Sequence, residues 1–237
     1  IKSLYNSAIN LKKNIPEIKV KFVLIDFNSP ETDKQKMRSL LEGFKLKFIS
    51  LDTKKFNFQF KPINKNNEEF QNNMSSTMAS IYESFDLAKN SEDLIYFVED
   101  DYIHKSESLT EMVLSFEKFA TIFNRDLFLL STDYPFLYKK LEDSKLLIGE
   151  KYHWRSVQES LLTFLTSSKM IKNHYNKLSE MAKIESDPFE KNLHEIYKNE
   201  ICLSPVPSLS LHCANINSVF GLSPNINIEK LWNENNY

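Results

Sequence analysis

Apolar and polar positions repeat along this chain with two different spacings. Apolar residues spaced three and four apart predict helices at residues 3–14, 32–42, 75–89 and 109–123. Short apolar runs predict strands at residues 19–27, 46–51, 94–98 and 127–131. Helices that alternate with strands are typical of a sheet built from right-handed crossovers. The predicted fold class is therefore α/β, with a mostly parallel sheet flanked by helices.

The second half of the chain is less regular. Residues 145–154 and 160–166 read as strands that could pair antiparallel, and residues 169–182 and 187–199 read as helices. We therefore expect an antiparallel and helical C-terminal half. The segment 52–73 is rich in Lys, Asn and Gln and predicts a polar loop. No internal repeat and no convincing linker divides the chain, so we expect a single domain.

The predicted strand at residues 94–98 runs directly into Glu99, Asp100 and Asp101. A strand that is apolar on both faces is expected in the middle of a covered sheet, and ligands of open α/β sheets bind at strand ends. Three adjacent carboxylates repel one another unless a cation or hydrogen-bond donors offset their charge. Carboxylate oxygens suit Mg²⁺ or Mn²⁺, which also bind phosphate. The sequence indicates a site for a metal and a diphosphate, with a solvated acidic turn as the structural alternative.

Composition narrows the possible functions. The 237 residues carry a formal net charge of -2, which gives no signature of nucleic-acid binding. With three Gly and no glycine-rich phosphate motif, Rossmann dehydrogenase and P-loop functions are excluded. No apolar run approaches the ~20 residues of a membrane span. Cys202 and Cys213 are too few for a disulfide framework, so we expect reduced thiols and a cytoplasmic protein. Lysine runs leave peripheral association with the inner face of a membrane open.

The order of these features resembles that of GT-A fold glycosyltransferases, most closely family 2 and related nucleotide-sugar transferases. Asp26 ends the first strand, and Asn73-Met74-Ser75-Ser76 with Ala79 opens a helix that corresponds to the family's helix rich in small residues. Glu99-Asp100-Asp101 then resembles the acidic motif at a strand end, and Asp187 and His212 follow in the family's order. The resemblance covers most of the chain, although each motif is short.

The resemblance implies a metal-dependent transfer of a sugar from a nucleotide-sugar donor to a glycan or lipid-linked acceptor. It implies an inverting reaction in surface polysaccharide synthesis, with residues 1–135 binding the nucleotide sugar and residues 136–237 binding the acceptor. Asp101 and His212 would hold Mn²⁺ or Mg²⁺, and imidazole favours Mn²⁺. Asp187, or its rival Glu190, would accept the proton of the acceptor hydroxyl.

The remaining candidates are residues expected to bind substrate: Asp26, Asn28, Glu99, Asp100, Asp133, Trp154 and Arg155. Asp26 could accept hydrogen bonds from the nucleobase or ribose, or only cap the turn at Asn28. Trp154 could stack on a sugar face while Arg155 meets a phosphate, or the tryptophan could be buried in the core. Asp187 precedes a proline and could simply cap a helix.

Three other functions stay open at this point. A sugar-phosphate nucleotidyltransferase shares the sheet architecture, but its basic, glycine-rich N-terminal loop is absent from the sequence. A module that binds a nucleotide or glycan without catalysis would show tight binding and no turnover. A metal-dependent phosphoesterase is the least favoured, because the chain has no H-x-D or D-x-H pair.

Overall fold

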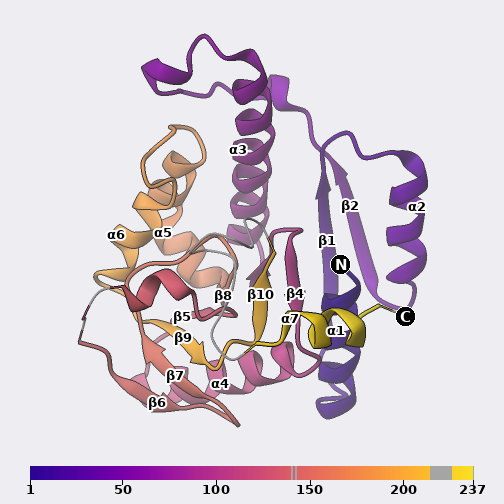
Figure 1. The fold of residues 1–237 in the computed structure, drawn as a ribbon, viewed down its shortest axis with the longest axis vertical. Helices are drawn as coiled ribbons and strands as arrows, with labels where there is room; N and C mark the ends of the chain where they lie inside the picture. Colours follow the sequence, from indigo (N-terminus) through magenta and orange to yellow (C-terminus); the bar gives the residue numbers. More distant parts are fainter. Residues whose placement is uncertain (140, 142, 214–225, 237) are drawn as a thin grey trace. The chain divides into compact units, whose positions relative to one another are not determined.

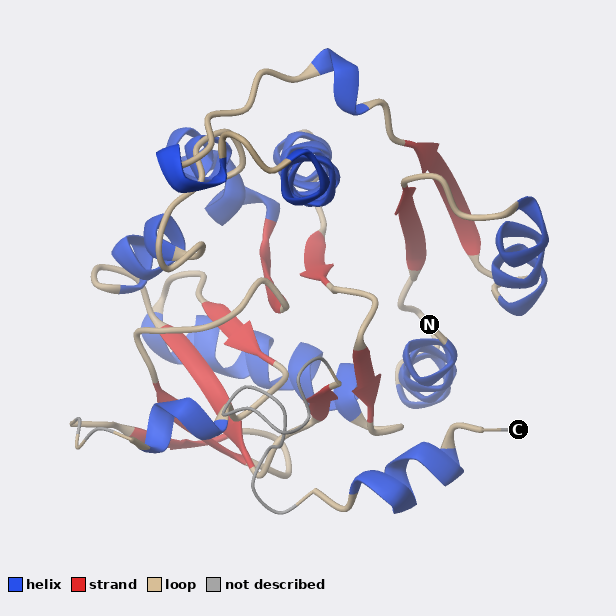
Figure 2. Cartoon of the chain, turned by 45° about the horizontal axis from the view of Figure 1, so that its top comes forward, coloured by secondary structure: helices blue, strands red, loops and turns tan. Residues whose placement is uncertain are grey.

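The structure, a computed structural model, describes residues 1–139, 141, 143–213 and 226–236 (Figure 1). It contains two compact units. Unit 1 comprises residues 1–20, 96–166 and 197–237, and unit 2 comprises residues 21–95 and 167–196. Both units take segments from each side of residue 135, so they do not follow the predicted halves 1–135 and 136–237. The α/β fold class is confirmed, and helices and strands are distinguished in Figure 2.

Unit 1 is organised around a six-stranded mixed sheet with the order β3-β8-β5-β9-β7-β6. The strands are β3 (Leu94–Phe97), β8 (Phe164–Ser167), β5 (Phe128–Leu130), β9 (Cys202–Val206), β7 (His153–Ser156) and β6 (Leu146–Ile148). Strands β5 and β9 are parallel, whereas β5 pairs antiparallel with β8, as β7 does with β9 and with β6. Antiparallel pairing is therefore present in the second half, but not between the expected partners: β8 pairs with β5, and β7 pairs with β9 and β6. A separate antiparallel pair joins β4 (Tyr102–His104) to β10 (Ser210–His212).

The helices of unit 1 are α1 (Lys2–Asn14), α4 (Ser108–Phe123) and α7 (Ile228–Glu234), with a 3₁₀ turn, η3, at Pro135–Tyr138. Helix α4 forms where predicted because its apolar residues recur every three or four positions and are buried. It ends at Asn124, whose φ of 51° is left-handed and stops the helical hydrogen-bond pattern. The core that α4 covers contains Met112, Phe116, Phe119, Leu127, Leu129, Trp154, Leu165, Leu203 and Leu209.

The position of β3 corrects one expectation. The apolar run at 94–98 predicts a central strand, but β3 lies at the end of the six-strand order and stops at Phe97. Glu99, Asp100 and Asp101 consequently lie in the connection that leads to β4, with a turn at Asp100 and Asp101. Because the three acids lie outside a strand, their side chains do not have to alternate between two faces of a sheet.

The predicted strand at 145–154 is two strands, β6 and β7, joined by a turn. That turn closes around Glu111 of α4, which is buried with 2% of its surface exposed. Its Oε2 accepts the backbone N–H of Lys151 at 2.8 Å, and its Oε1 accepts the indole N–H of Trp154 at 3.1 Å and the hydroxyl of Ser115 at 2.8 Å. A carboxylate from a distant helix thus supplies the partner for backbone groups that a continuous strand would have paired.

Unit 2 contains the parallel pair β1 (Lys21–Asp26) and β2 (Lys45–Ser50), with α2 (Glu31–Leu40) between them in sequence. Its other helices are α3 (Glu68–Lys89), α5 (Ser168–Met181) and most of α6 (Lys191–Tyr197), and its 3₁₀ turns are η1 (Thr53–Lys55) and η2 (Pro62–Asn64). Helices α3 and α5 pack together, and the hydroxyl of Tyr175 donates to Asp86 at 2.8 Å.

Two helix starts differ from the prediction. Helix α3 begins inside the predicted polar loop, because Oδ1 of Asn67 accepts the N–H of Phe70 at 3.0 Å and caps the helix. Helix α6 begins at Lys191, four residues after the predicted start at Asp187. In the part of the chain that the structure describes, no helix has both the length and the apolar character needed to cross a membrane.

The turn around Glu111 yields a stability prediction. A Cβ at Gly149 would lie 2.3 Å from Nε1 of Trp154, 2.4 Å from Oγ of Ser115 and 2.6 Å from Oε1 of Glu111. We expect Gly149→Ala to lower the free energy of unfolding by about 3 kcal/mol or more, because it overpacks the core and disturbs a buried network. Urea denaturation followed by circular dichroism measures this loss.

Gly43→Ala is the matched control. Gly43 has a φ of +94° but nothing within 4 Å of an added Cβ, so only backbone strain of about 1 kcal/mol is expected. An equal or smaller loss for Gly149→Ala would contradict the close packing of this turn.

Candidate functional site

Asp101 and His212, the two residues predicted as metal ligands, lie together in unit 1. The antiparallel pairing of β4 with β10 sets Tyr102 opposite His212, and the N–H of Cys213 donates to the carbonyl of Asp101 at 2.7 Å. Nε2 of His212 lies 2.9 Å from Oδ2 of Asp101. Backbone pairing therefore brings these two side chains together although 111 positions separate them in sequence.

The second oxygen of Asp101 is in a different situation. Oδ1 of Asp101 is buried and has no hydrogen-bond partner among the described residues. A buried polar atom without a partner costs free energy, and the cost is larger for a charged group. A cation at this position would remove that cost.

The donor set fits a divalent cation that obtains part of its coordination from a ligand. Within residues 1–139, 141, 143–213 and 226–236, no group of three or more His, Cys, Asp or Glu side chains is arranged to hold a metal. Mg²⁺ and Mn²⁺ sites that bind nucleotides commonly use one or two protein ligands and complete the shell with phosphate oxygens and water. Asp101 and His212 would match that requirement once Nε2 of a neutral imidazole turns from Oδ2 of Asp101 to the cation, and the imidazole suits Mn²⁺.

Two tyrosines that the sequence analysis did not single out hold the imidazole in place. The ring of Tyr102 stacks on His212, with ring centroids 4.8 Å apart and planes inclined by 27°. Its hydroxyl lies 2.7 Å from the hydroxyl of Tyr134, and both tyrosines are buried. Burial, together with the nearby Tyr134 and Glu99, raises the pKa of Tyr102 well above its ordinary value. The only sequence signal was that each tyrosine directly follows a predicted acidic site residue.

The other two acids of the motif differ in exposure. Glu99 is half-buried, and its backbone N–H donates to Oγ1 of Thr163 at 3.2 Å. The Thr163 hydroxyl also lies 3.4 Å from Oε2 of Glu99. Asp100 is exposed at the turn. Glu99 is therefore held by Thr163, which directly precedes β8, whereas Asp100 faces solvent. Substrate binding by both acids stays a prediction.

Asp133 and Arg155 form an ion pair within unit 1, in which Asp133 is buried, whereas substrate binding by Arg155 stays a prediction. Asp133 is 1% exposed, and its Oδ1 accepts from Nη2 of Arg155 at 2.8 Å and from Nε at 3.1 Å. The hydroxyl of Tyr138 donates to Oδ2, and the guanidinium lies 4.3 Å from the Tyr138 ring centroid. The Asp133 carboxylate is thus occupied by protein groups, and the sequence did not indicate the contact with Arg155, which lies 22 positions away.

Trp154 is likewise not placed to stack on a sugar. Its exposed fraction is 0%, its indole donates to Glu111, and its ring packs edge-on against Phe119 at a centroid distance of 6.1 Å. The tryptophan fills the core of unit 1, which was the structural alternative given by the sequence.

Asp26 and Asn28 belong to unit 2. Oδ2 of Asp26 lies 3.1 Å from Nζ of Lys34, and Asp26 is 9% exposed. Burial raises the pKa of Asp26, but hydrogen bonds from Ser29 and Lys34 and the charge of Lys34 outweigh it, so the net pKa is lowered. Asn28 is exposed and has a left-handed φ of 61° in the turn after β1. These contacts support the turn-forming role, and nucleotide binding by either residue stays a prediction.

The two candidate bases also belong to unit 2. The side chain of Asp187 is 85% exposed and lies 3.3 Å from Nζ of Lys61. Because α6 begins only at Lys191, Asp187 does not cap this helix, which was the structural alternative to its predicted role as a base. Burial raises the pKa of Glu190, although a backbone hydrogen bond and His194 oppose the shift. A carboxyl with a raised pKa is the better proton acceptor near neutral pH, but the base stays a prediction.

Comparison with known proteins adds little beyond this geometry. No family model and no curated protein sequence matches the chain. Among solved structures, the chain is similar to one described as an apo UDP-glucose pyrophosphorylase, with a TM-score of 0.48 and 6% sequence identity. The similarity covers 92% of this chain and 82% of that chain. The functional proposal therefore depends on the residues of the site.

The ion pair of Asp133 with Arg155 yields a second stability prediction. We expect Arg155→Met to lower the free energy of unfolding by about 3–5 kcal/mol, because it leaves a buried carboxylate without its cation. Chemical denaturation of the purified variant measures the change.

The double variant Asp133→Asn with Arg155→Met is the control. Removing both charges should recover a substantial part of the loss, because no uncompensated charge then stays buried. Losses that simply add in the double variant would contradict a direct interaction between the two side chains.

Proposed function

We propose that the protein is a divalent-cation-dependent glycosyltransferase that takes its sugar from a nucleotide-sugar donor. The observation that carries the proposal is the Asp101–His212 pair with one buried carboxylate oxygen that has no partner among the described residues. Asp101 belongs to the run Glu99-Asp100-Asp101, which resembles the acidic motif that binds cation-bound diphosphates in GT-A glycosyltransferases. A diphosphate leaving group requires charge neutralisation, and the site offers ligands for the cation that would provide it.

In unit 1, two residues are proposed to bind the cation and two tyrosines to position the imidazole. Asp101 and His212 would hold Mn²⁺ or Mg²⁺, and when bound the cation supplies Lewis-acid neutralisation of the leaving diphosphate. Tyr102 fixes the plane of the imidazole by stacking, and its bond to Tyr134 fixes the tyrosine in turn. Such support keeps a ligand in one orientation and reduces the cost of binding the cation.

The identity of the acceptor and the stereochemical outcome extend this proposal. The resemblance favours an inverting enzyme that acts on a glycan or lipid-linked acceptor in surface polysaccharide synthesis. Asp187 and its rival Glu190, both in unit 2, stay the two candidates for the base. Neither assignment is needed for the binding of the donor.

Nucleotidyl transfer between a sugar phosphate and a nucleoside triphosphate is the second candidate reaction. Asp101 and His212 would serve it equally, because that reaction also needs a cation on a chain of phosphates. The two reactions release different products. Glycosyl transfer releases a nucleoside diphosphate, whereas nucleotidyl transfer releases pyrophosphate.

The deciding experiment incubates the full chain and Mn²⁺ with UDP-, GDP- and CDP-sugars and separately with nucleoside triphosphates and sugar phosphates. Release of a nucleoside diphosphate that depends on an added glycan acceptor supports glycosyl transfer. Release of pyrophosphate would replace it with nucleotidyl transfer. Tight nucleotide binding without any turnover across both panels would instead indicate a non-catalytic binding module.

Asp101→Asn tests the metal site itself. We expect it to weaken Mn²⁺-dependent binding of the nucleoside diphosphate by about 100-fold, because it removes the charged ligand of the cation. Isothermal titration calorimetry with and without Mn²⁺ measures the affinity. Asp33→Asn is the matched control, since Asp33 is an exposed acid that pairs only with Lys36 in the described residues. An unchanged affinity in Asp101→Asn would remove Asp101 from the metal shell.

A further inference from the structure

Three phenylalanines of unit 2 form an aromatic ladder along one side of an extended segment. Residues 56–60 are extended, and Gln59 forms a parallel bridge with Ile184. Side chains two positions apart share a face of an extended chain, so Phe56, Phe58 and Phe60 project to the same side. The rings of Phe56 and Phe58 stack with centroids 5.7 Å apart. The segment is therefore held in one register by backbone and ring contacts.

Helix α3 anchors the inner end of this ladder. The ring of Phe56 packs edge-on against Tyr82 of α3 at a centroid distance of 5.4 Å. Phe56 thus serves the packing of unit 2, and it does not line the pocket at the outer end of the ladder. Phe58 and Phe60 are half-buried, so parts of both rings face outward.

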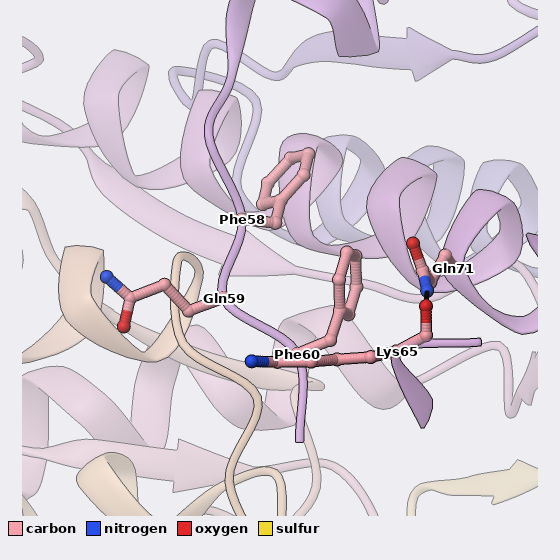
Figure 3. A pocket seen from close by; sticks show the side chains of 5 residues that line it. All are labelled: Phe58, Gln59, Phe60, Lys65 and Gln71. Carbon is pink, nitrogen blue, oxygen red and sulfur yellow. Dashed lines mark hydrogen bonds between the residues drawn. The ribbon is translucent and has the colours of Figure 1, made fainter. Parts of the chain in front are cut away.

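Phe58 and Phe60 line a pocket of about 470 Å³ together with Gln59, Lys65 and Gln71 (Figure 3). The two ring centroids are 6.3 Å apart and the planes are inclined by 50°, so the rings form an angled wall. In Figure 3 the rings lie on one side of the extended chain and the Gln59 side chain on the other, and the Lys65 side chain runs beside Phe60. The pocket is an open hollow at the surface of unit 2 and not an enclosed cavity.

The polar edge of the pocket is fixed by hydrogen bonds. Nε2 of Gln71 donates to the carbonyl of Asn64 at 2.9 Å and also to the carbonyl of Lys65. The amide oxygen of Gln71 stays available as an acceptor among the described residues. Lys65 is exposed, and within the described part of the chain its ammonium forms no ion pair. The pocket thus combines aromatic rings with a fixed acceptor and a mobile cationic donor.

A second hollow of about 420 Å³ shares Gln59 with the first and is lined mainly by polar side chains, including Asn57, Asn176 and Lys183. Asn57 and Gln59 lie on the opposite face of the extended segment from the phenylalanines. The segment therefore separates an aromatic pocket from an amide-rich hollow. A ligand with several linked polar rings could contact both, whereas a single apolar chain would match only the first.

We propose that the pocket lined by Phe58, Phe60, Lys65 and Gln71 binds a saccharide. A sugar ring presents apolar C–H faces that pack on aromatic rings and hydroxyl groups that bond to amides and ammonium groups at the rim. An acyl chain would leave the amide groups of the rim without partners on desolvation, even where the carboxylate of a fatty acid pairs with Lys65. Lys65 gives preference to sugars that carry a carboxylate. This proposal does not depend on the transferase reaction, because binding is measured directly.

Saturation-transfer difference NMR on the full chain tests the proposal. The probes are maltotetraose as a neutral saccharide, tetragalacturonate as an acidic saccharide and octanoate as an acyl chain. We expect saturation of sugar-ring protons, with tetragalacturonate bound more tightly than maltotetraose and no saturation of octanoate. Phe60→Ala should raise the dissociation constant about tenfold. Lys65→Gln should raise it about threefold for the acidic sugar and leave the neutral sugar unchanged.

The controls separate this pocket from other effects. Ile63→Ser removes an apolar side chain that is 86% exposed in the same loop and does not line the pocket, so sugar binding should persist. Phe60→Tyr keeps the ring and should keep the affinity. Asp101→Asn, which disables the proposed metal site in unit 1, should also leave saccharide binding intact. Failure of the transferase assay would therefore not imply failure here.

Three results would overturn the proposal. The first is an absence of sugar saturation for both saccharides at millimolar concentration. The second is saturation that is the same in Phe60→Ala as in the unchanged protein, with both shown by circular dichroism to be folded. The third is saturation of octanoate that Phe60→Ala abolishes, since this would assign the pocket to acyl chains. If Phe60→Ala unfolds, Lys65→Gln replaces it, because this change is at an exposed side chain. Equal binding of the acidic sugar by Lys65→Gln and by the unchanged protein would then overturn the proposal.

Discussion

The contact between Asp101 and His212 is the interaction on which the proposed site depends. The backbone pairing of β4 with β10 fixes both residues, and the 2.9 Å contact between Oδ2 and Nε2 uses one oxygen of the carboxylate. The other oxygen is buried without a partner in the described residues. Folding thus places a charged group where it is incompletely satisfied, which is the usual condition of a site that acquires its partner on binding.

Asp101 is only partly buried, with 34% of its side chain exposed, and two fully buried acids of unit 1 show why its Oδ1 stands out. Glu111 accepts hydrogen bonds from backbone N–H groups, the Ser115 hydroxyl and the Trp154 indole. Asp133 accepts from Arg155 and from Tyr138. Both carboxylates are therefore stabilised by protein groups and serve the fold. Asp101 differs from Glu111 and Asp133 because one of its oxygens is buried without a hydrogen-bond partner in the described residues. We therefore treat Asp101 as a candidate ligand and the other two acids as structural.

The sequence predicts the local elements well and the long-range polar contacts poorly. The helix expected at 109–123 is α4, and that expected at 169–182 is α5, because apolar spacing and capping are local properties. The strand expected at 145–154 divides because Glu111, 40 positions before Lys151, supplies the hydrogen bonds of the turn. No local pattern contains that information. The start of α6 is missed for a different reason, since a residue before proline is only one of several possible caps.

In the candidate site, too, the local features could be predicted from the sequence and the long-range contacts could not. The acidic run at 99–101 is visible in the sequence, and the resemblance pairs Asp101 with His212, which the structure brings together. The supporting stack of Tyr102 on His212 depends on strand register and could not be read from spacing. The predicted substrate contacts of Trp154 and Asp133 fail because a tryptophan or an aspartate next to a candidate site can equally be a buried structural residue.

Anomalous diffraction at the manganese edge, from crystals soaked with MnCl₂ and a nucleoside diphosphate, locates the cation relative to Asp101 and His212. We expect a manganese peak in contact with Oδ1 of Asp101 and with Nε2 of His212, which then no longer bonds to Oδ2, and phosphates bound to the same ion. A peak elsewhere, or an Asp101 that keeps its bond to His212 while Oδ1 pairs with a protein group, would exclude this metal site.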